Sequence, residues 1–369
     1  MSAIPPAPRE LRFARSVSSD RSEEENVAAA PSARCQRAES PKQRLPLRHY
    51  RLYGLRIVCD FELPTDPVAQ SDADDEVDYF VSTLTSAQDP LTAPTVLFRS
   101  PEIGTEGEPQ LLIYRDDATG VTRWQWCDGV TIDVDGRCID VFCPPEEALS
   151  GVAHTVIGQV LAFLLRGRGY PLLHGSALAV GQDAFAILGP SGAGKSTLAT
   201  ALALRGYRLL TDDVVALVEA DALWNALTGY GGSRLWPDSA EMLLGKAAAI
   251  PLMLERTAYW TGFDKRYLRL RMASEAKATS RAPLRHIFVL QGREATGPVL
   301  ERLSGAAAVA ALDRNAYQLM LRGGEESRRD LAVFAALARQ ATVWRVVPGD
   351  DLAFIDALAA AVEERLSEQ

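Results

Sequence analysis

The chain has 369 residues, of which 47% are hydrophobic and 24% are charged, and its formal net charge is −9. These are ordinary values for a globular protein, and the length suits two modest domains or one large domain with an appendage. The acidic balance excludes a general nucleic-acid binder, because such proteins neutralise phosphates with clustered Lys and Arg. No apolar run is judged long enough to cross a bilayer, so no membrane insertion is expected.

Cysteine usage and the N-terminus bear on the cellular compartment. The five cysteines are an odd number without a CxxC pair, and the N-terminus lacks the apolar core of a signal peptide. This pattern suits a reducing compartment better than a disulfide framework or a zinc site. We therefore expect a cytoplasmic protein.

The first part of the chain divides into a tail and a β-rich region. Residues 1–46 are rich in Ser, Pro, Ala, Arg and Glu and almost lack aromatic residues. Such a segment cannot bury enough apolar surface to offset the entropy of ordering it, so we expect a disordered tail. Residues 47–145 instead predict a small β-rich N-terminal domain of short strands. Its last three predicted strands, separated by Asp-Gly turn pairs, cover residues 121–127, 130–134 and 138–142.

Residues 146–369 are expected to form a catalytic α/β domain. Residues 146–166 predict an amphipathic helix, because apolar residues recur near helical spacing. Residues 172–180 alternate as a strand, and residues 184–188 form a continuous apolar run, as in a strand buried on both faces. The other predicted elements are strands at 208–213, 267–270, 284–290 and 344–347 and helices at 330–339 and 352–366.

The apolar run leads into a complete G-x-x-x-x-G-K-S sequence. Its glycines permit backbone angles that turn successive amides inward, which forms an anion cradle for phosphates. In such a loop Lys195 reaches the β- and γ-phosphates, and the Ser196 hydroxyl binds magnesium. The sequence therefore predicts a P-loop with ATP and Mg²⁺ as cofactors. The residues expected to contact the nucleotide are Gly189, Pro190, Ser191, Gly192, Ala193, Gly194, Lys195, Ser196 and Thr197.

Two adjacent carboxylates, Asp212 and Asp213, close the predicted strand at 208–213. In a P-loop fold, a carboxylate at the end of a neighbouring strand lies beside the magnesium ion. Adjacent strand residues point to opposite faces, so one Asp could serve the metal or a water while the other takes the proton of an incoming hydroxyl. An Asp-Asp pair can also simply open a turn. The residues alone leave open which Asp is the base.

Three segments together resemble the catalytic core of HPr serine kinase/phosphorylase. They are His174-Gly175, the P-loop, and the sequence Arg-Gly-Tyr-Arg-Leu-Leu-Thr-Asp-Asp at 205–213. The strong part of the resemblance covers about residues 171–217. It implies a P-loop kinase domain with a mixed, PEP-carboxykinase-like sheet, and a homo-oligomeric protein.

The resemblance also implies roles for individual residues. Lys195 would bind phosphate, and Ser196 would hold Mg²⁺ together with Asp212. Asp213 would be the general base on the acceptor hydroxyl, and His174 would lie close to the transferring phosphate. The acceptor would be a Ser or Thr hydroxyl on a protein or peptide.

The chain departs from this family at several positions. The family's loop has Asp after the first glycine and Glu after the serine, where this chain has Pro190 and Thr197. The family's Glu-(Ile/Val)-Arg-Gly signature is not found, and residues 231–239 stand in its place. There Arg234 could stabilise transferring charge and Asp238 could be a second metal ligand, or either could be a helix-entry residue. Phosphorylase activity is therefore not expected, and the chain is similar to shorter HPr-kinase-like proteins found beside peptide-modification genes, including lasso-peptide kinases.

Four functions are compatible with these residues. The first is a serine/threonine kinase acting on a protein or peptide, and the second is a small-molecule kinase with the same chemistry. The third is a non-catalytic nucleotide-binding regulator whose front domain docks a partner. The fourth, a mechanochemical ATPase, needs a glutamate base and an arginine from a neighbour, and neither is evident.

Overall fold

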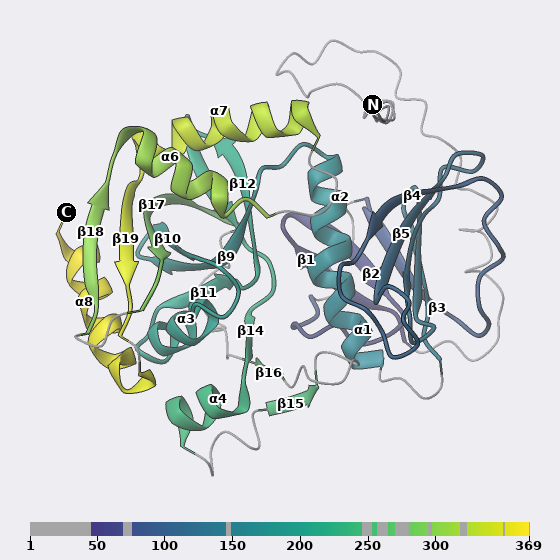
Figure 1. Cartoon of the computed structure of the whole chain (residues 1–369), viewed down its shortest axis with the longest axis horizontal. Helices are drawn as coiled ribbons and strands as arrows, with labels where there is room; N and C mark the ends of the chain where they lie inside the picture. Colours follow the sequence, from purple (N-terminus) through teal and green to yellow (C-terminus); the bar gives the residue numbers. More distant parts are fainter. Residues whose placement is uncertain are drawn as a thin grey trace, which may run out of the picture.

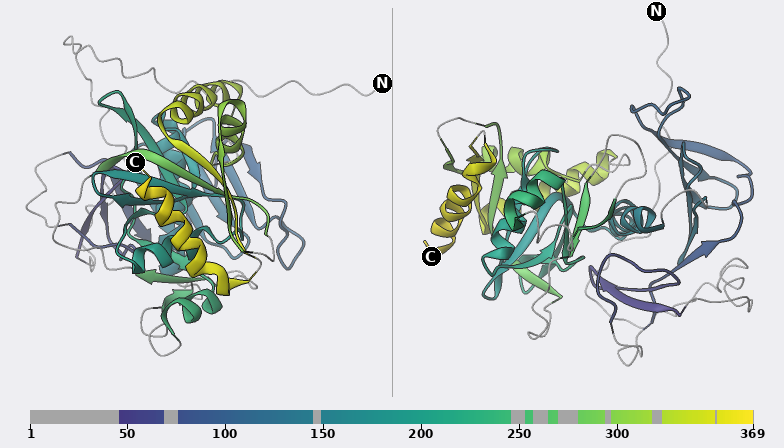
Figure 2. Two further views of the ribbon diagram at one scale, coloured as in Figure 1. Left: turned by 90° about the vertical axis from the view of Figure 1, so that its left-hand side faces the viewer. Right: turned by 90° about the horizontal axis from the view of Figure 1, so that it is seen from below.

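The computed structural model describes residues 46–68, 76–144, 149–245, 253–256, 265–269, 280–293, 297–317, 323–349 and 351–368. Two large sheets lie on either side of a long helix (Figure 1). Seen from below, the same helix is viewed end-on between the two halves (Figure 2). The protein is therefore a mixed α/β structure. Residues 1–45 of the predicted tail lie outside the described residues.

The first sheet contains eight strands in the order β1-β2-β3-β8-β7-β6-β5-β4. Its pairings are antiparallel except for β2–β3 and β3–β8, which are parallel. The strands predicted over 121–127, 130–134 and 138–142 correspond to β6, β7 and β8. The sheet consists of β1 (Arg48–Leu52), β2 (Leu55–Cys59), β3 (Tyr79–Leu84), β4 (Pro94–Arg99), β5 (Leu111–Asp116), β6 (Thr122–Trp126), β7 (Thr131–Asp135) and β8 (Cys138–Phe142).

The cysteines follow the expectation from their number only in part. Cys59, Cys127 and Cys143 are free thiols. Cys138, the first residue of β8, is disulfide-bonded. The expectation of unpaired cysteines is wrong there, because an odd count still allows one pair.

A continuous helical run of 19 residues, Leu149–Gly167, lies between the two sheets. It comprises α1 (Leu149–Thr155), a π-helical turn η3 (Val156–Val160) and α2 (Leu161–Gly167). Its length and its mean hydropathy of 1.4 are enough to cross a membrane, which corrects the expectation that no apolar run is long enough. In the structure 72% of its most apolar window is buried inside the protein. A helix covered from two sides is apolar nearly all round.

The second sheet follows the order β10-β9-β12-β13-β17-β19-β18, and β11 also pairs with β9. Strands β10, β17 and β19 are parallel to one another, so their carboxyl ends meet at one edge of the sheet. The remaining pairings are antiparallel. The strands are β9 (Leu172–Val180), β10 (Asp183–Leu188), β11 (Arg208–Thr211), β12 (Val214–Ala220), β13 (Leu223–Leu227), β17 (Arg281–Leu290), β18 (Val299–Leu303) and β19 (Thr342–Val347).

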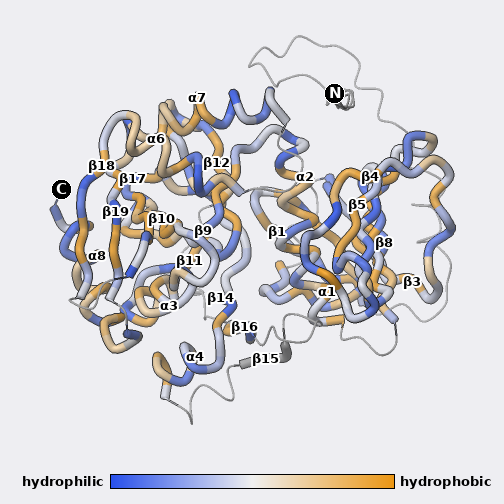
Figure 3. The backbone as a smooth tube through the Cα atoms, viewed as in Figure 1, coloured by the Kyte–Doolittle hydropathy of each residue, from blue (hydrophilic) through white to orange (hydrophobic). Residues whose placement is uncertain are grey.

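Helices cover both faces of the second sheet. They are α3 (Lys195–Leu204), α6 (Gly305–Arg314), α7 (Gly324–Gln340) and α8 (Ile355–Ser367). Helices α3 and α8 pack on the face that carries Phe185 and Ile187 of β10, and α6 and α7 pack on the face that carries Ala184 and Ala186. Both faces of β10 are therefore buried, as its continuous apolar sequence predicts. Figure 3 shows hydrophobic residues along the strands of both large sheets.

A small third sheet, in the order β14-β16-β15, lies next to the end of α3 that follows the glycine-rich loop. Its elements and the helices beside it are β14 (Gly232–Leu235), α4 (Pro237–Leu244), β15 (Met253–Arg256), β16 (Arg266–Arg269) and the 3₁₀ turn η4 (Leu352–Phe354). The helix start indicated by Pro-Asp-Ser is confirmed, because α4 begins at Pro237. Leu270, the last residue of the strand predicted at 267–270, lies outside the described residues.

A buried ion pair joins the central helix to α7. Nη1 of Arg166 lies 2.6 Å from Oδ2 of Asp330, and the two side chains are 7% and 0% exposed. Nη2 of Arg166 also donates to the carbonyl oxygen of Tyr317 at 3.2 Å. A buried charge that loses its partner keeps its full desolvation penalty.

We expect the substitution Asp330→Ala to lower the free energy of unfolding by about 3–5 kcal/mol, because it leaves the Arg166 charge buried and unpaired. Urea unfolding measures this change. The matched control is Glu301→Ala, which breaks the exposed pair between Glu301 and Arg345 at 2.8 Å, and it should cost less than about 1 kcal/mol. Equal losses in the two variants would contradict the prediction.

Candidate functional site

The glycine-rich loop follows β10 directly and ends where α3 begins. Gly189, Gly192 and Gly194 have φ angles of 148°, 78° and 98°, in the region that favours glycine. A Cβ atom on Gly189 would lie 2.9 Å from the carbonyl oxygen of Leu290 in β17, so close packing also excludes a side chain there. The loop therefore needs its glycines for both conformation and space.

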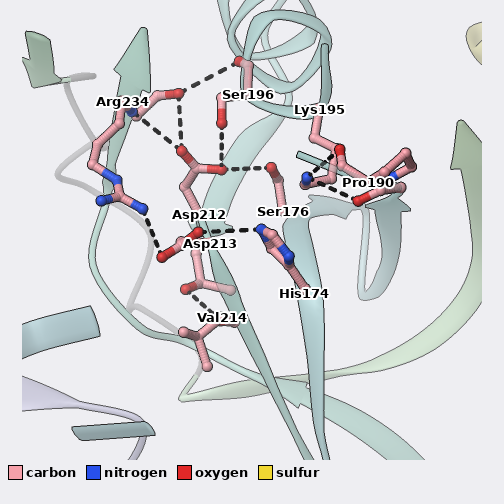
Figure 4. A network of polar contacts seen from close by, with 12 residues as sticks. His174, Ser176, Pro190, Lys195, Ser196, Asp212, Asp213, Val214 and Arg234 are labelled. Carbon is pink, nitrogen blue, oxygen red and sulfur yellow. Dashed lines mark hydrogen bonds and ion pairs between the residues drawn. The ribbon is translucent and has the colours of Figure 1, made fainter. Parts of the chain in front are cut away.

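Lys195 is the first residue of α3, and its side chain folds back over the loop. Its Nζ donates to the carbonyl oxygens of Gly189 at 2.9 Å and Pro190 at 3.0 Å (Figure 4). Burial lowers the pKa of the ammonium group, and the negative charges of Asp213 and Asp212 oppose that effect. Carbonyl dipoles of its own loop thus satisfy the Lys195 ammonium.

Asp212 is buried and accepts four hydrogen bonds. Its Oδ1 accepts from the hydroxyls of Ser176 at 2.6 Å and Ser196 at 3.1 Å. Its Oδ2 accepts from the Ser233 hydroxyl and from the backbone N–H of Arg234, both at 3.2 Å (Figure 4). The bond from Ser196 connects this carboxylate to the glycine-rich loop. Sequence reasoning missed Ser176 and Ser233, because a serine within a strand belongs to no local motif.

Asp213 is the next residue and has different partners. Its Oδ2 lies 2.7 Å from Nη2 of Arg234, and its Oδ1 lies 3.4 Å from Nε2 of His174 (Figure 4). Burial raises the pKa of the Asp213 carboxyl, but the charge of Arg234 and the hydrogen bond from His174 outweigh it and hold the pKa well below its usual range. Asp213 in turn raises the pKa of Arg234. Three of the residues predicted for catalysis therefore meet in one cluster.

The two carboxylates diverge because of a turn. The strand expected at 208–213 is wrong at its end, since β11 stops at Thr211 and both aspartates precede β12. Asp213 has a φ of 73°, a left-handed conformation that Asp tolerates better than most residues. A turn that opens after the strand, and not strand alternation, gives the two side chains their separate partners.

An aromatic ring and a glycine lie beside Asp213 and His174. The ring of Tyr317 meets the ring of His174 edge-on at 5.9 Å. A Cβ atom on Gly158, in the π-helical turn, would lie 3.8 Å from Oδ2 of Asp213. The central helix thus comes close to the carboxylate at a residue without a side chain. Such π-helical turns are frequent at functional sites.

Two predicted site residues make no recorded contact with this cluster within the described ranges. Thr197 is buried in the first turn of α3 and lines a cleft beside the loop. Asp238 lies in the first turn of α4, and its role as a metal ligand stays a prediction. In the part of the chain that the structure describes, no group of three or more His, Cys, Asp or Glu side chains could hold a metal ion.

The cleft beside the loop has a volume of about 350 Å³, including its mouth. Its walls come from segments that follow β10, β17 and β19, at the edge where these parallel strands end. Ligands of open α/β sheets bind at such an edge. Arg293 at its rim donates from Nη2 to the carbonyl oxygen of Gly192 at 3.3 Å. Its other lining residues include Ala193, Gly194, Thr197, Pro348, Gly349 and Phe354.

Comparisons with known proteins give one distant likeness. No family model matches the chain, and no curated protein matches it. Among solved structures, the Hpr(Ser) kinase/phosphatase from Coxiella burnetii matches 53% of this chain and 95% of its own, with 12% sequence identity and a TM-score of 0.27. At these values the likeness assigns no function, and the residue roles depend on this chain's own geometry.

His154 on the central helix lies within electrostatic reach of the cluster. Its Nδ1 bonds the carbonyl oxygen of Ser150 at 2.8 Å, so Nδ1 carries the proton and Nε2, which is buried without a partner, does not. Its ring packs edge-on against Tyr267 at 4.9 Å. Burial lowers the pKa of His154 to about 4, the bond to Ser150 opposes this, and the charge of Arg234 adds to it. The folded protein therefore keeps His154 neutral.

We expect His154 to make stability depend on pH. Between its unfolded pKa near 6.5 and its folded pKa of about 4, the unfolded chain binds more protons, so stability falls as the pH falls through this window. The loss is about 3 kcal/mol for this residue alone. The substitution His154→Phe keeps the ring contact and removes the titration. The difference between the unfolding free energies of the two proteins should change by that amount between pH 7 and pH 4, and a constant difference would contradict the prediction.

Proposed function

We propose that this chain is an ATP- and Mg²⁺-dependent kinase that transfers the γ-phosphate to a Ser or Thr hydroxyl on a protein or peptide. The observation that carries the proposal is the division of labour between two adjacent carboxylates. Asp212 bonds the loop serine, Ser196, whereas Asp213 lies between His174 and Arg234. A phosphoryl-transfer site needs these two functions side by side: one carboxylate at the metal and one at the acceptor.

The glycine-rich loop and Lys195 suit the phosphates of ATP. The positive φ angles at the three loop glycines are those that direct backbone amides toward an anion, and the N-terminus of α3 adds its dipole. Lys195 already holds two carbonyl oxygens of the loop. In the complex its ammonium exchanges these dipoles for phosphate charge, a stronger partner.

The oxygens around Ser196 fit a magnesium ion. Mg²⁺ prefers oxygen ligands and is commonly bound by one or two protein groups together with substrate phosphates and water. The Ser196 hydroxyl and the Asp212 carboxylate, 3.1 Å apart, supply such a pair. When bound there, the ion would neutralise charge on the phosphates.

The cleft beside the loop suits the nucleoside of ATP. It begins at Gly194 and Thr197, where the phosphate cradle meets α3, and extends to Phe354. The Phe354 ring offers apolar surface for a base, and Arg293 at the rim offers a guanidinium group. A nucleotide in this position spans from the cleft to the Asp212–Asp213 turn.

Asp213 suits the role of base although its pKa is low. The transition state of phosphoryl transfer is loose, so orienting the hydroxyl matters more than strong basicity. Arg234 holds the pKa down in the resting site. When Arg234 turns toward the transferring phosphoryl group, the carboxylate loses that partner and becomes a stronger base. His174 remains beside the reacting atoms.

We expect Asp213→Asn to lower phosphate transfer by about a hundredfold or more, because it removes the base. The affinity for ATP should persist. The assay supplies γ-labelled ATP and Mg²⁺ with HPr, with hydroxyl-bearing peptides encoded beside the gene, and with a metabolite extract. Asp183→Asn, on β10 at an ion pair with Arg285, serves as control and should leave transfer unchanged.

The destination of the label separates the candidate functions. Label on a protein or peptide supports the proposal, and label only on a metabolite replaces it with a small-molecule kinase. Tight ATP binding without transfer to any acceptor would overturn it in favour of a nucleotide-binding regulator.

We expect Asp212→Asn to affect the metal instead of the proton. In the wild type, Mg²⁺ should strengthen ATP binding, and the variant should lose about tenfold or more of that enhancement. Calorimetric titrations with Mg²⁺ and with EDTA measure it. Asp213→Asn is the matched control, because it removes a neighbouring charge yet should keep the magnesium dependence. The same loss in both variants would argue against separate roles.

A further inference from the structure

The turn between β1 and β2 carries a tyrosine from the first sheet into the second. Tyr53 and Gly54 form this turn with φ angles of 54° and 78°. The Tyr53 side chain is almost fully buried, at 1% exposure. Its backbone N–H donates to the carbonyl oxygen of Thr228 at 2.7 Å. The chain therefore accepts an unfavourable backbone conformation at a non-glycine residue in order to place this ring.

The Tyr53 hydroxyl lies at the turn that carries the two aspartates. It is 3.1 Å from Oγ1 of Thr211 and 3.3 Å from the carbonyl oxygen of Val214. The Thr211 hydroxyl also lies 2.9 Å from that carbonyl oxygen. The two hydroxyls have one proton each, so one donates to the Val214 carbonyl and the other donates to the first hydroxyl. Thr211 and Val214 are the residues immediately before and after Asp212 and Asp213.

Gly229 shows how closely the ring is enclosed. A Cβ atom on Gly229 would lie 2.5 Å from Cζ of Tyr53 and 2.5 Å from Oγ1 of Thr211. Its N–H donates to the carbonyl oxygen of Leu210 in β11 at 2.9 Å. The segment 228–229 thus holds the ring against the turn, and no larger residue fits there without moving it.

We propose that Tyr53 is a positioning residue for phosphate transfer: the N-terminal half of the protein fixes the backbone of the Asp212–Asp213 turn through this hydroxyl. This inference rests on the proposed kinase function for its effect on rate, but its structural part does not. Asp213 has a left-handed backbone that few residues adopt, and a bond on each side of the aspartate pair restrains it. The β-rich half is thereby part of the catalytic apparatus and not only a docking module.

The test compares Tyr53→Phe with Tyr50→Phe in the full-length protein. Tyr50 is a matched control, because it lies in β1, is also 1% exposed, and its hydroxyl accepts a hydrogen bond from the Leu63 N–H at 3.0 Å. Each variant loses one buried hydroxyl, but only Tyr53 contacts the turn. Thermal unfolding confirms that both variants are folded.

The first measurement is amide hydrogen exchange in the peptide spanning residues 209–216. The Val214 N–H, bonded to the Asp212 carbonyl at 3.0 Å, reports on the turn. Tyr53→Phe should speed exchange there by roughly tenfold, the equivalent of one ordinary buried hydrogen bond. Tyr50→Phe should leave it unchanged. Equal exchange in Tyr53→Phe and wild type overturns the inference, whatever the protein phosphorylates.

The second measurement is the kinetics of transfer. Tyr53→Phe should lower kcat by about tenfold and leave the KM for ATP unchanged, since the phosphate cradle is not touched. Thr211→Val removes the other hydroxyl, and the double variant should lose less than the product of the two single losses, because both hydroxyls act on one turn. Losses that multiply, or a kcat unaffected by Tyr53→Phe, overturn a catalytic consequence. A wild type that transfers phosphate to nothing defeats the kinase proposal, and the exchange result still decides the positioning.

Discussion

The burial of the apolar helix Leu149–Gly167 on two sides is the constraint on which the rest of the structure depends. One hydrophobic cluster contains Trp124 of the first sheet, Leu165 of the helix and Val214 of the second sheet. Neither sheet could separate from the helix without exposing this surface to water, at about 25 cal/mol for each Å² of apolar area. The two halves therefore form one folding unit around the helix. The turn that carries the aspartates lies at this junction, because Val214 belongs to both.

Placing two adjacent carboxylates at such a junction has an electrostatic cost. The protein meets it with a different set of donors for each carboxylate. Asp212 receives three hydroxyls and one backbone N–H, which hold it in a single orientation without a cation. Asp213 receives the guanidinium of Arg234 and the imidazole of His174. The first arrangement is rigid and close to neutral, and the second is charged, so a substrate phosphate can compete for its cation.

Local patterns predicted the elements that depend on neighbouring residues. Strand β9 has the bounds expected, and the glycine-rich loop lies between a strand and a helix because its sequence encodes that conformation. The pairing of Asp213 with Arg234 and His174 was within reach only through the resemblance to a known family. Contacts across the fold could not be predicted: Tyr53 lies 158 residues from Thr211, and no periodicity relates them. The turn at Asp213 was missed because strand patterns do not encode a positive φ.

On the proposed function, the resting site is one in which every cation is already occupied. Lys195 holds carbonyl oxygens of its own loop, and Arg234 holds Asp213. Nucleotide binding then exchanges partners instead of filling an empty charge, so its net free energy is the difference between two sets of contacts. The same exchange frees the Asp213 carboxylate only when a phosphoryl group has taken Arg234. The base would thus become available in the state that has a phosphate to transfer, which couples activation of the acceptor hydroxyl to occupancy by ATP.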